Sequence, residues 1–314
     1  RSDYRNQFAG AVEATASTGG QIMPPIMGAA AFILSEIIGT PYLMVCLAAL
    51  APALMYYGCL FIMVDVESLK SNLKGMDIKD VPKLGPVVKK GQKLIIPIIV
   101  LIISLTILRR TPMKSAIYSM GALILCSLLD KADRFSLEKL INAFKEAARG
   151  SSQIVAACAT SGIIISMLSI TGLGIKLSNF LFQLGQNNLF ACLFISMIIS
   201  TILGMGLPAS AAYIITASTI GPSLVNLGVP PIAAHLFLFY FSAISCITPP
   251  VAIASYAAAG LADASPVSVG LEAVKLGIVG FIVPYAFVYN PVIVGVGIDS
   301  FNGFLAYIIN FIFI

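Results

Sequence analysis

The sequence predicts an all-α polytopic membrane protein, with broken helices or re-entrant hairpins in two repeat-related halves. The first observation is composition: 58% of the 314 residues are apolar and only 11% are charged, and the mean hydropathy is +0.96. Soluble domains carry about 25% charged residues. The second is a series of apolar runs of membrane-spanning length. The third is that Gly and Pro interrupt several of these runs, as broken helices require.

Continuous apolar runs predict the ordinary spanning helices, because about 20 mostly apolar residues cross a bilayer. A shorter run, Leu94–Leu108, ends at Arg109 and Arg110, whose side chains can reach the interface. Phe304–Ile314 is apolar but too short to span. The clear candidate spans are Tyr42–Val64, Ser115–Leu129, Leu189–Leu203, Ile232–Ile247 and Leu271–Val288.

Three further apolar runs are interrupted. Met23–Ile38 begins at a proline pair, Gln153–Ile170 is followed by two glycines, and Gly204–Ser218 contains two glycines and a proline. Because non-helical backbone at membrane depth occurs only where protein or a cavity surrounds it, such runs predict broken helices or hairpins.

The polar segments set the topology and the domain boundaries. Asp65–Lys93 is predicted to be a loop, and Phe135–Arg149 an amphipathic helix on the membrane surface. The basic residues of these two segments place both in the cytoplasm. Seven Lys lie between 70 and 93 and five Lys and Arg between 130 and 150, against three in the turn between them. The predicted parts are 1–64, 65–150 and 151–314.

An internal repeat relates the two ends of the chain. Pro24 and Pro25 recur as Pro249 and Pro250, 225 positions later, and the same spacing relates Pro41 to Pro266. Small polar residues precede the proline pair both times. Paired interruptions of this kind are typical of transporter folds, so residues 1–64 and 151–314 are predicted to be two transport repeats.

These interruptions are the candidate binding site. Proline lacks the N–H that closes a helical hydrogen bond, so two prolines leave carbonyls free. Carbonyls and hydroxyls suit Na⁺ or a polar substrate, and a helix restarting at the prolines favours a carboxylate. The alternative is that the prolines only kink helices and the small residues only allow close packing. The candidates are Ser17, Thr18, Gly19, Gly20, Pro24, Pro25, Gly204, Gly206, Pro208, Ser245, Thr248, Pro249 and Pro250.

Three more residues are possible members of the site: Glu13, His235 and Ser242. Ionisable groups within a membrane are costly and therefore functional candidates. Glu13 has the alternative of facing water near the interface, and His235 that of a helix-to-helix hydrogen bond. Glu272 and Lys275, three residues apart, are expected to pair on one helix face.

Other function classes lack support. No nucleotide-binding loop, HExxH or GxSxG pattern occurs, so an intramembrane enzyme is disfavoured and no cofactor is expected beyond Na⁺ as coupling ion. The basic residues lie in short connections, which disfavours nucleic-acid binding. The six Cys lie in apolar runs without a CxxC pair and are interpreted as buried hydrophobic residues.

The segment GAVEATASTGGQIMPPIMGAAAFI (Gly10–Ile33) resembles the large membrane subunit of tripartite ATP-independent periplasmic (TRAP) transporters. It is most similar to the fused-permease branch that works with TAXI-type solute-binding proteins. Further similar segments are Gly204–Ile214, Ala233–Gly260 and Val283–Pro291. The family has a membrane region before the GAVEA motif, and this chain starts just before that motif, so an N-terminal truncation is expected.

The resemblance implies a Na⁺-coupled importer of organic acids, either carboxylates or amino acids, in the bacterial or archaeal cytoplasmic (inner) membrane. A periplasmic TAXI-type protein would deliver the substrate, and an elevator-like domain would move it. Two alternatives remain: a dicarboxylate carrier that needs no binding protein, and a truncated membrane scaffold that does not transport.

Overall fold

The computed structural model describes residues 4–73, 84–106, 108, 110, 112–129, 137–172, 176, 183 and 188–297. Every regular element in this part of the chain is helical. The chain divides into two compact units, residues 1–73 with 154–314, and residues 74–153. Within the described ranges, two stretches, Tyr42–Lys70 and Pro266–Tyr289, are long and apolar enough to cross a membrane, and five shorter apolar helices accompany them.

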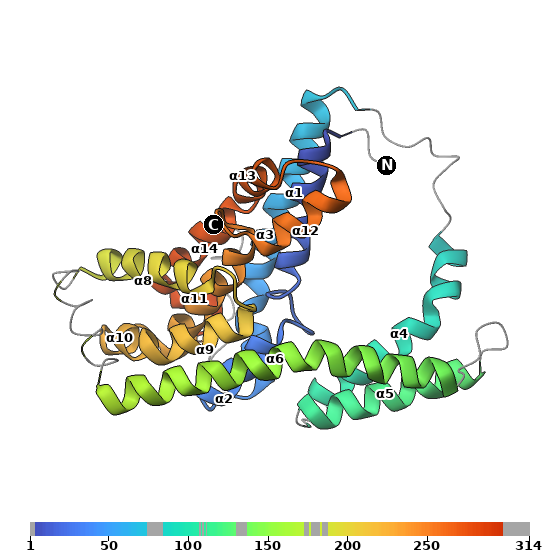
Figure 1. Cartoon of the computed structure of the whole chain (residues 1–314), viewed down its shortest axis with the longest axis horizontal. Coiled ribbons are helices and arrows are strands. Elements are labelled where there is room, and N and C mark those ends of the chain that lie inside the picture. Colours follow the sequence, from blue (N-terminus) through green and yellow to red (C-terminus); the bar gives the residue numbers. More distant parts are fainter. Residues whose placement is uncertain are drawn as a thin grey trace. The chain divides into compact units, whose positions relative to one another are not determined.

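The first unit contains two pairs of helices separated by interruptions. α1 (Asn6–Gly19) is followed by α2 (Ala29–Ile37) and the long α3 (Tyr42–Lys70). α11 (Pro231–Ile244) and the short 3₁₀ helix η1 (Ser245–Ile247) are followed by α12 (Ile253–Ala262). α1 packs against α3, α12 and α13 (Pro266–Leu276), as Figure 1 shows.

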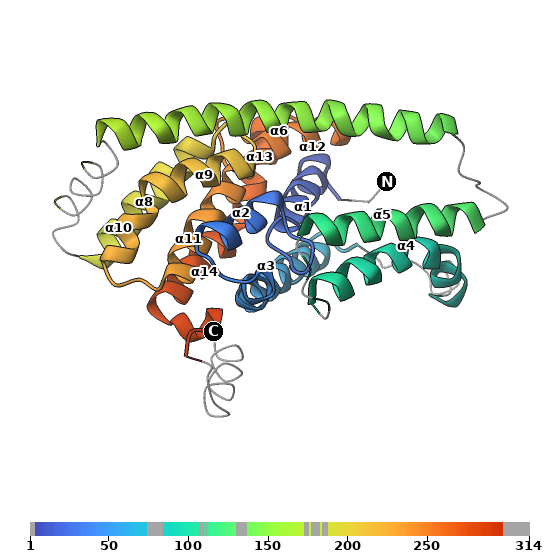
Figure 2. The same ribbon diagram turned by 90° about the horizontal axis from the view of Figure 1, so that it is seen from below.

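A second group of helices surrounds α11. α8 (Leu189–Gly204), α9 (Ala209–Thr219), α10 (Gly221–Asn226) and α14 (Ile278–Tyr289) all pack against it; Figure 2 shows α8, α9 and α11 together. The 3₁₀ helix η2 (Pro291–Val294) packs against α3 and α14. Every α11 residue from Ala233 to Ile244 is buried. A helix that is apolar on all sides forms the centre of such a bundle.

The second unit contains α4 (Leu84–Thr106) and α5 (Pro112–Leu129), which pack against each other. The Ser119 hydroxyl donates to the Pro97 carbonyl (2.8 Å). Because Pro97 lies inside α4, this bond joins the two helices where proline interrupts the hydrogen-bond ladder. α6 (Leu137–Thr171) continues past the unit boundary.

Prolines set where several helices begin. Pro41 and Pro208 are the N-caps of α3 and α9, whereas Pro231 and Pro266 occupy the first turns of α11 and α13. A proline at the start of a helix has no missing intrahelical bond, since the first N–H groups lack partners anyway. α8 begins differently, because the Asn188 side chain accepts a hydrogen bond from the Phe190 N–H (2.9 Å).

Two sequence predictions of local structure are wrong. The predicted loop Asp65–Lys93 is helical at 65–70 and 84–93, in α3 and α4. The surface helix and the separate span predicted on either side of Gly150 form one helix, α6, because a single glycine costs a helix only about 1 kcal/mol. The predicted span Leu271–Val288 falls within the membrane-length stretch Pro266–Tyr289, which comprises α13 and α14 and has a single-residue break at Gly277. Phe304–Ile314 lies outside the described residues.

Candidate functional site

The two proline pairs interrupt their helices with the same local backbone. Each pair contains a cis peptide bond, and the second residue after each pair, Met27 or Ala252, has a positive φ of 50° or 35°. The N–H of Met27 donates to the Met23 carbonyl, and that of Ala252 donates to the Thr248 carbonyl, both at 3.2 Å. The donor residues, 27 and 252, and the acceptor residues, 23 and 248, are again 225 positions apart.

The helices before the interruptions follow the same spacing. α1 covers residues 6–19 and α11 covers 231–244, so both ends are displaced by 225 positions. The short helices after the interruptions, α2 and α12, end at 37 and 262, again 225 apart. The similarity therefore extends beyond the prolines to both ends of the preceding helices and to the ends of the following ones.

The hydroxyls of the first interruption have unequal surroundings. Ser17 is exposed, and its hydroxyl donates to the Glu13 carboxylate (3.1 Å) on the same face of α1. The Thr18 side chain is only 3% exposed, and its hydroxyl has no partner in the described structure. An unpartnered buried hydroxyl is costly unless a water, ion or ligand satisfies it.

The hydroxyls of the second interruption bond back to their own helix. Ser245 donates to the Ser242 carbonyl (2.7 Å), and Thr248 donates to the Ile244 carbonyl (2.9 Å). Ser242 itself donates to Leu238 (2.8 Å) and lies 3.4 Å from the Thr216 hydroxyl of α9. These side chains therefore replace part of the bonding that the helix loses at its end.

The third interruption, Gly204–Pro208, connects α8 to α9. A side chain at Gly204 would overlap that of Ser245, so the end of α8 can approach η1 only because residue 204 is glycine. Gly206 has a φ of +81°, a conformation that glycine adopts without strain. Pro208 then begins α9 as its N-cap.

The three interruptions lie together in the first unit. The Gln21 side chain, in the first interruption, lies beside Cys246 in the second, and α1 packs against η1. Gly204 contacts Ser245, and Gly206 faces Val251 directly after the second proline pair. Segments up to 225 residues apart in the sequence thus form one cluster of helix ends.

Two carbonyls at equivalent places remain free in the described part of the chain. Those of Pro24 and Pro249 accept no hydrogen bond, and neither does that of Gly20. Carbonyls and hydroxyls at broken helices are the ligands that Na⁺ takes in membrane transporters. In the described residues, no group of three or more His, Cys, Asp or Glu side chains that could hold a transition metal occurs.

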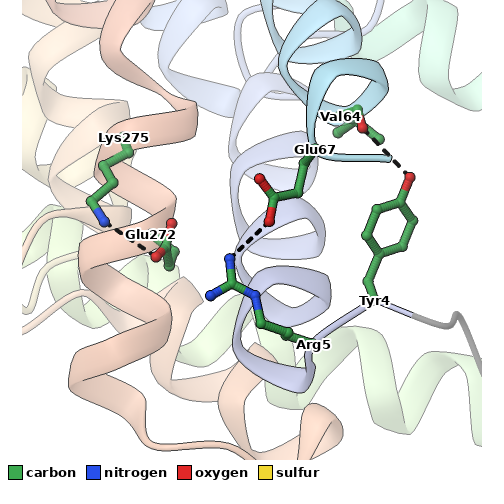
Figure 3. A network of polar contacts seen from close by, with 6 residues as sticks. All are labelled: Tyr4, Arg5, Val64, Glu67, Glu272 and Lys275. Atoms are coloured by element: carbon green, nitrogen blue, oxygen red, sulfur yellow. Dashed lines mark hydrogen bonds and ion pairs between the residues drawn. The ribbon is translucent and has the colours of Figure 1, made fainter. Parts of the chain in front are cut away.

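The remaining residues that the sequence analysis named have partners on neighbouring helices or lie at the surface. His235 is buried in α11, and its Nδ1 is 2.9 Å from the Tyr213 hydroxyl of α9, which is the helix-to-helix bond considered as the alternative to a site role. Glu13 is exposed. Lys275 and Glu272 form the expected pair at 3.2 Å, and Figure 3 shows it near the Arg5–Glu67 ion pair.

The sequence reasoning missed three tyrosines of α3. The hydroxyls of Tyr56 and Tyr57 donate to the carbonyls of Thr15 (3.0 Å) and Ala16 (2.7 Å) near the end of α1. The Tyr42 hydroxyl lies 3.0 Å from the carbonyls of both Pro25 and Ile26. A Tyr-Tyr pair inside an apolar span was a usable signal, because tyrosine hydroxyls need partners when buried.

Comparison with known proteins identifies one family that the chain matches. Residues 1–300 match the family model described as "Tripartite ATP-independent periplasmic transporter, DctM component". No curated protein matches the chain.

Proposed function

The chain belongs to the DctM family, the membrane permease component of TRAP transporters, and from this premise we propose that it is a Na⁺-coupled importer of organic acids. DctM components work with a periplasmic binding protein and a small membrane subunit. We propose a TAXI-type binding protein as the partner, a carboxylate or amino acid as the substrate, and the bacterial or archaeal inner membrane as the location.

The observation that carries the proposal is the convergence of three helix interruptions. Their free carbonyls, those of Gly20, Pro24 and Pro249, offer oxygen ligands for Na⁺. The helices α2, α9 and α12 begin at the same cluster, and the partial positive charge of a helix N-terminus favours a carboxylate. A cation and an anion can therefore bind in one place, which is the requirement for cotransport.

The common spacing of 225 positions supports two repeat-related transport halves. It relates the bounds of α1 and α11, the cis proline pairs and the positive φ of Met27 and Ala252. A transporter of this kind moves a rigid domain around the bound substrate, and helix interruptions in corresponding positions of the halves form the binding site. We propose that the unit of residues 1–73 and 154–314 contributes this moving domain.

Uptake by the reconstituted transporter tests the proposal. Proteoliposomes would contain the permease with its small subunit, and radiolabelled carboxylates and amino acids would be offered with or without the purified binding protein and a Na⁺ gradient. Uptake that needs both supports the proposal. Uptake without the binding protein indicates an autonomous carrier, and no uptake by folded protein indicates a membrane scaffold.

Thr18→Val tests the site itself. The Thr18 hydroxyl has no partner in the described structure, so replacing it with a methyl group of similar shape leaves folding unchanged or improves it. If the hydroxyl binds Na⁺ or substrate, half-saturation rises about fivefold or more. Ser71→Ala, at the exposed end of α3, is the matched control. Unchanged half-saturation in Thr18→Val would remove Thr18 from the site.

A further inference from the structure

Three tyrosine hydroxyls of α3 bond to backbone carbonyls before and within the first interruption. Tyr56 and Tyr57 reach the last turns of α1, and Tyr42 reaches the second proline of the cis pair and the residue after it. The Cys46 thiol also lies 3.9 Å from the Pro25 carbonyl. One helix thus holds the end of α1 and the middle of the segment that follows it.

These bonds tie the segment to α3. The Ala16 carbonyl also accepts from the Gly20 N–H (3.2 Å), so Tyr57 is an additional donor there, whereas Tyr42 donates to carbonyls that lie outside any helix. Tyr56 is 2% exposed and Tyr42 is 8% exposed, so both hydroxyls are shielded from water. A buried hydroxyl that loses its acceptor pays a desolvation cost, so these bonds restrict where the segment can lie.

The Tyr56 ring occupies a space that two glycines leave open. A Cβ on Gly19 of α1 would lie 2.5 Å from the Tyr56 Cε1 atom, and a Cβ on Gly280 of α14 would lie 3.1 Å from its Cε2 atom. The first distance is shorter than real Cβ contacts, and the second is tighter than most of them. The ring is therefore fixed between α1 and α14, which fixes the direction of its hydroxyl.

Among the described residues, the second interruption has no equivalent support from tyrosines at the corresponding positions. The positions 225 residues after Tyr42, Tyr56 and Tyr57 are Val267, Phe281 and Ile282, which have no hydroxyl. The bonds at the second interruption come from its own segment: Ser255 donates to Ile247 (3.5 Å) and Tyr256 donates to Pro250 (3.3 Å). The two interruptions therefore share their backbone conformation but differ in the element that donates hydrogen bonds to them.

We propose that Tyr42, Tyr56 and Tyr57 are positioning residues, which hold the carbonyls and the free Thr18 hydroxyl of the first interruption in a binding geometry from α3. This inference rests on the proposed function, because it assigns a role to that site. The tyrosines do not themselves bind ion or substrate. Their hydroxyls act through the backbone atoms that they hold.

The test uses Tyr42→Phe, Tyr56→Phe and Tyr57→Phe, which remove only the hydroxyl, in the transporter with its partner subunits. Tyr289→Phe is the matched control, since Tyr289 is 54% exposed. The expected result is a half-saturation for Na⁺ raised about fivefold per hydroxyl, as one net hydrogen bond implies, with the maximal rate changed less than twofold. A residue with a merely structural role would lower the amount of folded protein and leave half-saturation unchanged.

Amide hydrogen exchange supplies a second readout that needs no transport. Peptides covering residues 16–28 should exchange about fivefold faster in each variant, whereas peptides covering 245–256 should not change. If wild-type uptake proves independent of Na⁺, the proposed function fails, and the exchange result still decides the positioning role. Unchanged exchange at 16–28 in all three variants, or an equal increase at 245–256, would overturn the inference.

Discussion

Gly204→Ala is the most direct test of the contact between two interruptions. Gly204 is the last residue of α8 and is buried against Ser245 of η1. An added Cβ would lie 2.8 Å from the Ser245 Cβ and closer to its hydroxyl. Since ordinary carbon contacts begin near 3.5 Å, α8 or η1 has to move by roughly 0.7 Å. Overpacking of this kind costs about 1–3 kcal/mol.

The Ser245 side chain cannot simply rotate away from the added methyl group. Rotation would break its hydrogen bond to the Ser242 carbonyl (2.7 Å), which costs about 1 kcal/mol more. Ser245→Gly removes both the clash and this bond. The double variant should therefore be more stable than the sum of the single changes by about 1–3 kcal/mol.

Denaturant unfolding in detergent micelles measures this coupling, with proteoliposome uptake as the second readout. Gly58→Ala is the control, because a Cβ at Gly58 of α3 meets nothing within 4 Å; it should be neutral or slightly stabilising. Uptake should fall in Gly204→Ala, since the shift moves α8 and η1 apart at the proposed site. Additivity of Gly204→Ala and Ser245→Gly within about 0.5 kcal/mol would refute the contact.

Two further predictions concern bonds away from the interruptions. His235→Phe leaves the fully buried Tyr213 hydroxyl without its partner and should destabilise by about 1–3 kcal/mol; adding Tyr213→Phe should cost less than its effect alone, and additive unfolding energies would argue against the bond. Arg5→Ala removes an ion pair with Glu67 in which the arginine side chain is 59% exposed. The change should lower the free energy of unfolding by less than about 1 kcal/mol, and 1 M salt should abolish this difference. A larger loss of stability that does not depend on salt would mean that Arg5 contributes through packing and not through the ion pair.

Sequence patterns predicted the helices whose ends are chemically marked. The predicted span from Tyr42 begins directly after Pro41, as α3 does, since the missing N–H of proline is tolerated at a helix start. The run Leu189–Leu203 became α8 with one residue added. The interruption at Pro24 was recognisable for the same reason, since two prolines in an apolar run cannot be part of a regular helix.

Breaks that packing causes were not recognisable. At Gly277 the chain carries no proline, yet α13 ends there and α14 follows. A Cβ at this position would lie 2.9 Å from the Ile247 side chain, so the glycine allows η1 to approach. That neighbour is 30 residues away in the sequence, and no local pattern identifies it. Tyr56 and Tyr57 were recognisable as a pair that needs hydrogen-bond partners, but those partners on α1 are about 40 residues away, so the sequence did not identify them.

The burial of α11 at the centre of the bundle could not be predicted from the spacing of its apolar residues. In a membrane protein, a helix facing lipid and a helix facing protein are both apolar, so the sequences of α3 and α11 do not distinguish the two positions. In the structure α3 exposes Phe61 at 77%, whereas Ala233–Ile244 of α11 is buried throughout. Non-helical backbone at membrane depth is tolerated only where protein or a cavity surrounds it. A helix buried on all sides can therefore end inside the membrane, and α11 ends at the second interruption, where its last carbonyls accept from Ser245 and Thr248 and where α8 and α12 pack against η1.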